Sequence, residues 1–343
     1  MCLIKIGIIK TSLNRRKVYF LLKMKPINVS VIGCGVWGSN HARVYNEASS
    51  INLQSVADLD KKRVETVAEK YNVEGYTDIE KIISDKNVEA VSICTSTVTH
   101  ANLALIAIEA GKHVLVEKPM TNTITEAKQL IKAAEKHDVK LAVGFVERFN
   151  PAVQEAFKLI KEGQIGKIIL AHTSRVSRRP VRIGDVGVVK DLGIHDIDII
   201  SQLFQINPES IYATCGSIDH SFEDYANINL RYNDNRNAFI ETNWLTPRIR
   251  RNLIITGTTG IITVQYRTQQ ITIENNRQLI QPYIQYQEPL KLELESFINS
   301  IRDNKVPVVT GEDGLKALTI AEAALESNKT KETIDFHRFL KEN

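Results

Sequence analysis

The sequence predicts an α/β protein of two domains, the first built on a parallel sheet and the second an α+β domain with a large, mainly antiparallel open sheet. The chain has 343 residues, enough for two cores of ordinary size. Hydrophobic residues make up 43% and charged residues 24%, the composition of a globular chain. Up to about residue 143 short β-branched runs alternate with helical patterns, whereas strand patterns dominate beyond residue 210.

A basic extension precedes the first predicted strand. Residues 1–23 contain six Lys or Arg residues and no acid, and removing them changes the formal net charge from +4 to −2. The basic balance therefore gives no reason to expect nucleic acid or membrane as a partner. We expect either that Met24 is the true start or that residues 1–23 are a loose extension. A targeting peptide is the alternative, but the apolar stretch from Val18 to Leu22 is too short for one.

Membranes, metals and disulfides are all disfavoured. No apolar run approaches the ~20 residues that span a bilayer, and we expect a cytoplasmic protein. The four cysteines lie far apart and show no metal-ligand spacing, so neither a metal site nor a disulfide framework is indicated.

The first domain is predicted to extend over residues 24–147. Its strands are expected at 29–32, 53–57, 90–94, 114–116 and 141–143. Helices are expected near 38–48, 61–71, 78–84, 98–110 and 124–137. Thr123 and Glu126 have the spacing of a capping box for the last of these helices. This alternation is typical of a parallel sheet covered on both faces.

The second domain is predicted to extend over residues 148–343. Asn150 followed by Pro151 is typical of a helix start. A helix carrying Asp191 and His195 then precedes strands between 210 and about 284, with turns near 233–235 and 257–260, and helical spacing returns from 311 to about 340. An open sheet with one solvent-facing side is a natural surface for association.

A glycine-rich turn directly follows the first predicted strand. In Gly33-x-Gly35-x-x-Gly38 the first glycine permits the tight turn, the second lets a pyrophosphate approach the backbone, and the third brings the helix close to the strand. The helix start, with Val36 and Trp37, would offer amide donors and positive partial charge to the phosphates. The turn's place between strand and helix indicates a Rossmann dinucleotide-binding domain.

An acidic residue at the end of the second strand predicts which dinucleotide binds. Asp58 follows Gly38 by 20 residues, where a carboxylate accepts from the ribose 2′-hydroxyl of NAD and repels the 2′-phosphate of NADP. Two alternatives remain: the basic run Lys61, Lys62 and Arg63 could favour NADP, and Asp58 could merely cap the next helix. We predict NAD.

Four motifs together resemble one family of oxidoreductases. Residues 24 to about 330 resemble the Gfo/Idh/MocA family through the stretches at 33–38, 95–100, 117–119 and 191–195. The resemblance implies that Lys118 contacts the reacting hydroxyl and the nicotinamide ribose, that His195 is the acid/base and that Asp191 tunes it. It also implies cofactor contacts from Thr95, Ser96, Thr97, His100 and Glu117. Because the family commonly associates through its open sheet, we expect a homodimer or homotetramer.

The residue types fit the oxidation of an alcohol. Asp191 and His195 are four apart, so on a helix both would project from one face. A histidine can accept the alcohol proton, a carboxylate can stabilise the resulting imidazolium, and the ammonium of Lys118 can steady the developing alkoxide. The alternative is a surface ion pair between Asp191 and His195, with Lys118 in a solvated loop.

An arginine cluster predicts an anionic substrate. Arg175, Arg178, Arg179 and Arg182 precede the Asp191 helix and could clamp a diphosphate, although a solvated loop is the alternative. Stretches at 144–151, 185–191 and 243–247 resemble the nucleotide-sugar branch of the family, which includes an enzyme that oxidises C3 of UDP-N-acetylglucosamine and passes the 3-keto sugar to an aminotransferase. In this interpretation Glu147 and Arg148 are further substrate-site candidates.

Two other functions remain open at this stage. One is a dehydrogenase of the same family that acts on inositol or a free sugar and would therefore need no diphosphate clamp. The other is a non-catalytic sensor that binds NAD and a sugar, although a sensor has no need to retain Lys118, Asp191 and His195.

Overall fold

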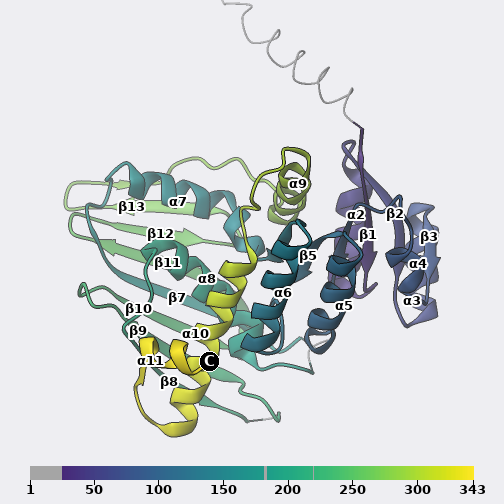
Figure 1. The fold of residues 1–343 in the computed structure, drawn as a ribbon. Helices are drawn as coiled ribbons and strands as arrows, with labels where there is room; N and C mark the ends of the chain where they lie inside the picture. Colours follow the sequence, from purple (N-terminus) through teal and green to yellow (C-terminus); the bar gives the residue numbers. More distant parts are fainter. Residues whose placement is uncertain (1–24, 181–183, 219) are drawn as a thin grey trace, which may run out of the picture.

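The structure is a computed structural model that describes residues 25–180, 184–218 and 220–343. The predicted extension, residues 1–23, and Arg182 lie outside the described residues. The chain forms two sheets, each with helices packed against it (Figure 1). The predicted fold class, a Rossmann domain followed by an α+β domain with an open sheet, is confirmed.

The first sheet has six parallel strands in the order β3-β2-β1-β4-β5-β6. They are β1 (Ile27–Ile32), β2 (Ile51–Ala57), β3 (Glu74–Tyr76), β4 (Ala90–Ile93), β5 (His113–Glu117) and β6 (Leu141–Gly144). Five of them were predicted. The three-residue β3 was not, because an edge strand of sequence Glu-Gly-Tyr has neither a β-branched run nor a buried face.

Helices cover both faces of this sheet, as expected for parallel strands. They are α2 (Val36–Glu47), α3 (Lys61–Tyr71), α4 (Glu80–Ile83), α5 (Thr97–Glu109) and α6 (Ile124–Lys136). The predicted capping box is present, since the Thr123 side chain accepts from the amide of Glu126 and the Glu126 side chain accepts from the amide of Thr123. Helices α2 and α3 pack on one face, and α5 contacts α6 and β5 on the other.

The second sheet has nine strands in the order β14-β13-β12-β11-β7-β10-β9-β8-β15. They are β7 (Ile168–Arg178), β8 (Ser210–Gly216), β9 (Tyr225–Arg231), β10 (Asn237–Asn243), β11 (Leu245–Gly257), β12 (Ile261–Gln265), β13 (Gln270–Glu274), β14 (Leu279–Ile280) and β15 (Ile334–Asp335). Neighbours are antiparallel except β7 and β10, which run parallel. The turns predicted near 233–235 and 257–260 join β9 to β10 and β11 to β12.

The central strand β7 was not predicted from the sequence. Its inward-facing residues include Thr173, Arg175 and Ser177, so the apolar alternation that marks a half-buried strand is absent there. Helices α7 (Pro151–Lys161), α8 (Ile194–Phe204) and α10 (Gly311–Thr330) lie on one face of the sheet, and α11 (Phe336–Glu342) follows β15 (Figure 1). The other face is open and exposes Tyr212 and Phe239.

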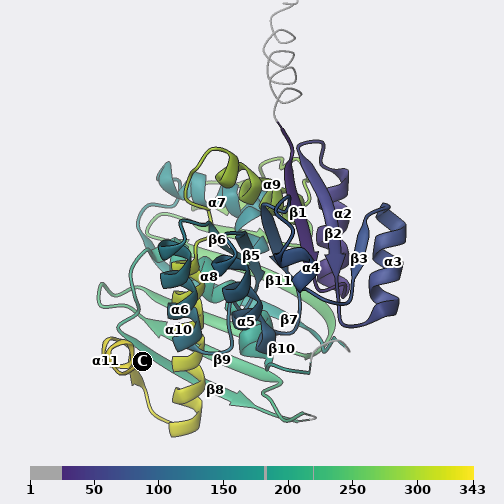
Figure 2. The same cartoon turned by 45° about the vertical axis from the view of Figure 1, so that its right-hand side comes forward.

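Two late helices join the second half of the chain to the first sheet. Helix α9 (Pro289–Arg302), which the sequence patterns did not reveal, places Leu294 and Phe297 in one core with Val29 and Val31 of β1. Helix α10 packs against α6 and also against α8 and β8, so it runs between the two sheets (Figure 2). Among the described residues, no helix is both long and apolar enough to cross a membrane.

Candidate active site

The glycine turn between β1 and α2 has the geometry of a phosphate cradle. Gly33 has a φ of +99°, and a side chain there would begin 2.7 Å from the backbone of Cys94. A Cβ at Gly38 would lie 1.6 Å from the Gly33 carbonyl oxygen, so only glycine lets α2 pack this closely. Above Gly35 there is open space, and α2 has no side-chain cap. Its first amides are therefore available to phosphate oxygens, which is the fit expected for a dinucleotide.

Asp58 stands at the end of β2 beside this turn. Its Oδ2 accepts from the amide of Cys34 at 2.7 Å and its Oδ1 from the amide of Asp60 at 2.9 Å, so the carboxylate is held in place at the cavity wall. The alternative that Asp58 caps α3 is wrong, because Asp60 caps that helix by accepting from Lys62 and Arg63. Asp58 is thus free to accept from a ribose hydroxyl.

One large cavity of about 1220 Å³ runs from this turn to the predicted catalytic lysine. Of the predicted cofactor residues it is lined by Gly33, Gly35, Val36, Trp37, Asp58, Thr95, Ser96, Thr97, His100, Glu117 and Lys118, while Gly38 packs behind the turn. His100 differs from the prediction in role: its ring nitrogens contact the carbonyls of Pro119 and Thr95 at 2.9 and 3.2 Å. It therefore holds the loop that carries Lys118 instead of offering a group to the cofactor.

Glu117 is a positioning residue beneath Lys118. It is buried, with Oε1 3.0 Å from Nε2 of the buried His41 and Oε2 accepting from the Lys118 amide at 3.2 Å. The end of β5 is thus fixed before the chain turns into the loop, and Lys118 projects from a rigid base.

Lys118 forms a buried ion pair with Asp191. In the sequence, only the family resemblance indicated that these two residues meet. The ammonium donates to Asp191 Oδ1 at 2.8 Å and to the Asp191 carbonyl at 2.7 Å, and both side chains are more than nine-tenths buried. Asp191 lies in the π-helical turn η2 (Val189–Gly193), which leads directly into α8. Such turns are frequent at functional sites because they redirect a side chain within a helix.

His195 lies one turn further on, in the first turn of α8, and is neutral. Burial, followed by the positive charges of Lys118, Arg175 and Arg251, lowers its pKa well below the ordinary value. The expectation that Asp191 stabilises a charged His195 is not met, since the Asp191 carboxylate binds Lys118. The Lys118 ammonium donates to that carboxylate, whereas burial and nearby cations lower the pKa of His195 and so disfavour its charged form.

Two buried atoms of this group lack hydrogen-bond partners within the described part of the chain. They are Oδ2 of Asp191 and Nδ1 of His195. Buried polar atoms are nearly always satisfied in folded proteins, and unsatisfied ones gather where a ligand supplies the missing partner. Together with Lys118 they offer two acceptors and a cation to a hydroxyl-bearing ligand, and the alternative of a surface ion pair and a solvated loop does not apply.

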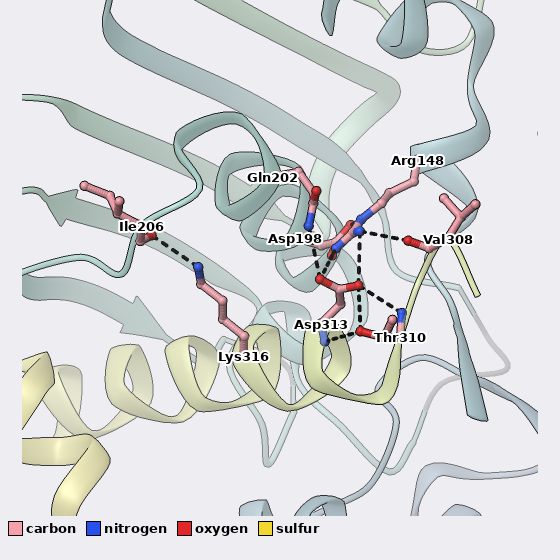
Figure 3. Close-up of polar contacts among 8 residues, drawn as sticks. All are labelled: Arg148, Asp198, Gln202, Ile206, Val308, Thr310, Asp313 and Lys316. Atoms are coloured by element: carbon pink, nitrogen blue, oxygen red, sulfur yellow. Dashed lines mark hydrogen bonds and ion pairs between the residues drawn. The ribbon is translucent and has the colours of Figure 1, made fainter. Parts of the chain in front are cut away.

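Three of the predicted substrate residues have internal partners. Arg175, 1% exposed, donates to Asp196 and to Glu147, each at 2.8 Å. Arg148, 4% exposed, donates through Nε to Asp198 at 2.7 Å and through Nη1 to Asp313 at 3.2 Å (Figure 3). We therefore correct the prediction that Arg175 is part of a diphosphate clamp and that Arg148 is free to bind substrate, because the donors of both are already used by carboxylates. Glu147 is held by Arg175 in the same way.

Two further arginines of the predicted cluster, Arg178 and Arg179, lie at the end of β7. Arg178 is exposed at the end of β7, and Arg179 lies over the ring of the buried Trp244 at 5.9 Å. Arg182 falls outside the described residues. Sequence reasoning missed Asp196 and Asp198, whose signal was two acids in an otherwise apolar helical stretch, and Arg251, whose effect on His195 becomes visible only when β11 is placed beside β7.

A phosphate cradle, a ribose-facing acid, and a lysine and histidine at the far end of one cavity define a nucleotide-dependent oxidoreductase. Residues 27–145 match the family described as "Oxidoreductase family, NAD-binding Rossmann fold", and residues 153–263 match the "GFO/IDH/MocA C-terminal domain". The chain belongs to the Gfo/Idh/MocA family and is an NAD-dependent dehydrogenase of CH–OH groups.

Similar proteins come from several bacteria. The chain is 30% identical to an inositol 2-dehydrogenase of Rhizobium meliloti and 29% identical to a myo-inositol 2-dehydrogenase of Thermotoga maritima, with 90% of this chain and 98% of each relative covered. Among solved structures, UDP-N-acetylglucosamine 3-dehydrogenase of Acidithiobacillus ferrooxidans superimposes with a TM-score of 0.83 at 26% identity, covering 90% of this chain and 99% of that one.

Proposed function

We propose that this protein oxidises a secondary hydroxyl of a nucleotide-linked sugar, at C3 of UDP-N-acetylglucosamine or a close relative, and yields the 3-keto sugar. The chemistry is carried by one observation: Lys118, paired with Asp191 at the end of the dinucleotide cavity, with the neutral His195 one turn away. The substrate class is supported by the solved UDP-N-acetylglucosamine 3-dehydrogenase, to which this chain is 26% identical.

Each residue of the trio has a separate task in this proposal. Bound NAD supplies the acceptor for the hydride that leaves the carbinol carbon. The Lys118 ammonium donates to the substrate oxygen and stabilises the negative charge that develops there. His195, neutral because burial and nearby cations lower its pKa, accepts the hydroxyl proton. Asp191 orients Lys118 through two hydrogen bonds and leaves Oδ2 for a neighbouring hydroxyl of the sugar.

The substrate is tested by NADH formation with a panel of alcohols. It contains UDP-N-acetylglucosamine, its uronic acid, UDP-glucose, inositols and free hexoses. We expect turnover with the UDP-linked sugars and a kcat/KM at least about tenfold lower with the unlinked rings, since these lack the charged group that a guanidinium binds. Activity confined to inositols or hexoses would refute the proposed substrate but not the dehydrogenation.

The second candidate substrate is inositol or a free sugar. It is favoured by the relatives named inositol 2-dehydrogenases, which match along nearly their whole length. The trio serves either substrate equally, because only a ring hydroxyl takes part in the reaction. If the protein binds NAD but forms no NADH with any member of the panel, we would infer a non-catalytic sensor.

We also propose association and a pathway partner. The open face of the nine-stranded sheet exposes Tyr212 and Phe239 and suits a homodimer or homotetramer, which light scattering of the purified protein would test. An aminotransferase would consume a 3-keto sugar. We place the protein in the cytoplasm, where thiols such as the unpaired Cys34 and Cys94 stay reduced.

A further inference from the structure

A second cavity adjoins the large one and is lined by residues of both halves of the chain. It has a volume of about 300 Å³ and is formed by the start of α2, the turn η1 (Val146–Phe149), the end of β12 and the segment that leads into α9. Trp37 lines both this cavity and the large one, so the two cavities adjoin at its side chain.

The second cavity also lies close to the acid/base. Arg251, in its wall, is one of the cations that lower the pKa of His195. Arg251 pairs in register with Arg175, on the strand that contacts α8. A substrate whose ring touches Lys118 and His195 can therefore extend its next group toward Arg251.

Positive charge exceeds negative charge at this wall. Among the described residues, Arg175 and Arg251 form ion pairs with two carboxylates, Glu147 and Asp196, and Arg267 forms none, while Arg43 of α2 pairs with Glu288 and Glu47. Burial and the charges of Arg175 and Arg267 lower the pKa of Arg251. One cation is therefore uncompensated, and an anion placed between Arg251 and Arg267 would relieve the repulsion.

Two of these guanidiniums can still bind a ligand. Arg251 reaches Glu147 only at 3.5 Å, longer than a hydrogen bond between charged groups, and more than a third of its side chain is exposed. Arg267 is exposed and has no ion-pair partner among the described residues. Tyr286 at the rim exposes 67% of its surface and offers a ring face beside Trp37. Two guanidinium forks with an aromatic rim suit a diphosphate that carries a base.

We propose that this second cavity binds the diphosphate of the nucleotide-linked substrate, with Arg251 and Arg267 as its ligands, while the sugar ring lies at Lys118 and His195. The inference rests on the proposed function, because it names the part of the molecule that selects a nucleotide sugar over a free one. It also replaces Arg178 and the rest of the β7 arginines as the diphosphate site.

The test is a kinetic comparison of three arginine variants. Arg267→Ala removes an unpaired, exposed guanidinium, so the fold is not perturbed. Arg178→Ala tests the rival site, and Arg277→Ala is the matched control, since Arg277 is exposed on the same sheet but lines neither cavity. We expect Arg267→Ala to raise the KM for the UDP-linked sugar about tenfold to hundredfold, with kcat and the KM for NAD unchanged. Arg277→Ala should equal the wild type.

Failure of the inference and failure of the proposed function give different results. If UDP-linked sugars are oxidised but only Arg178→Ala raises their KM, the cavity assignment is overturned and the function stands. If only unlinked rings are oxidised, the function fails, and the cavity is then tested by calorimetry with inorganic pyrophosphate on the NAD-saturated protein. Binding that Arg267→Ala weakens would support an anion site there, whereas binding that is absent or unaffected by the substitution would overturn it.

Discussion

The buried ion-pair cluster around Arg148 predicts a stability change that depends on pH. Arg148 in η1 binds Asp198 of α8 and Asp313 of α10, so one guanidinium links three elements (Figure 3). We consider Arg148→Met, which keeps most of the buried stem and removes only the charge. Asp198, 1% exposed, is then left without its cation, and Asp313 keeps its hydrogen bonds to Thr310.

The size of the expected destabilisation follows from the protonation state of Asp198. Burial raises the pKa of Asp198 to about 6, even though Arg148 lowers it. The difference from 3.8 corresponds to roughly 3 kcal/mol that ionisation of Asp198 costs the fold. Because the pKa of Asp198 is raised in the folded state, the stabilising contribution of protonated Asp198 is complete below pH 3.8. It is lost as the pH rises through about 6.

Removing Arg148 should therefore destabilise the protein by about 3–5 kcal/mol at pH 8, because the buried Asp198 must then either carry an unpaired charge or stay protonated well above its usual pKa. At pH 5, where Asp198 takes up a proton, the loss should be smaller by about 2 kcal/mol. Urea unfolding at the two pH values measures both quantities. Arg148→Met combined with Asp198→Asn should recover much of the loss at pH 8, because neither charge is then left alone. A loss of equal size at both pH values, or a double variant no better than the single one, would refute this reasoning.

Four further predictions concern the active site. Asp58→Ser should raise the KM for NAD at least about tenfold, since a ribose hydroxyl loses a held carboxylate; an unchanged KM in steady-state kinetics would contradict its assignment. His195→Ala should lower kcat about 100-fold or more, and wild-type turnover would mean that Lys118 alone handles the proton. Because its surroundings lower the pKa of His195, oxidation by the wild type should remain active below pH 6.5. Lys118→Met removes one of the positive charges that lower the pKa of His195, so this pKa should rise. The acid limb of the variant's residual pH–rate profile should therefore move to higher pH. An acid limb that stays in place would mean that it does not report the titration of His195.

Much of the first domain could be predicted because its signals are local. The glycine turn, the β-branched strands and the capping box at Thr123 each depend on residues close together in the chain. The second sheet was only partly predictable. In β7 the inward positions hold Arg175 and Ser177, which are stable there because Asp196 and Glu147 arrive from elsewhere to pair with the arginine. A pattern of apolar residues cannot reveal a strand whose buried face is polar.

The candidate site was likewise only partly predictable from local patterns. Lys118 and Asp191 are 73 positions apart, and only their motifs suggested that they meet. The arginine cluster was misread for a related reason. A run of arginines in sequence resembles one anion clamp, yet in the fold Arg175 points inward to carboxylates and Arg178 is exposed. Arg251, whose charge acts on His195, comes from the neighbouring strand β11, and no local pattern connects the two residues.

Helix α9 also affects the order in which the protein can fold. The core beside β1 and α2 is completed by Leu294 and Phe297, residues made some 150 positions after the last strand of the first sheet. Domains often fold as soon as they leave the ribosome. Here the nascent first domain keeps an apolar face uncovered until nearly the whole chain has been synthesised, and a fragment that ends at residue 147 should aggregate instead of folding.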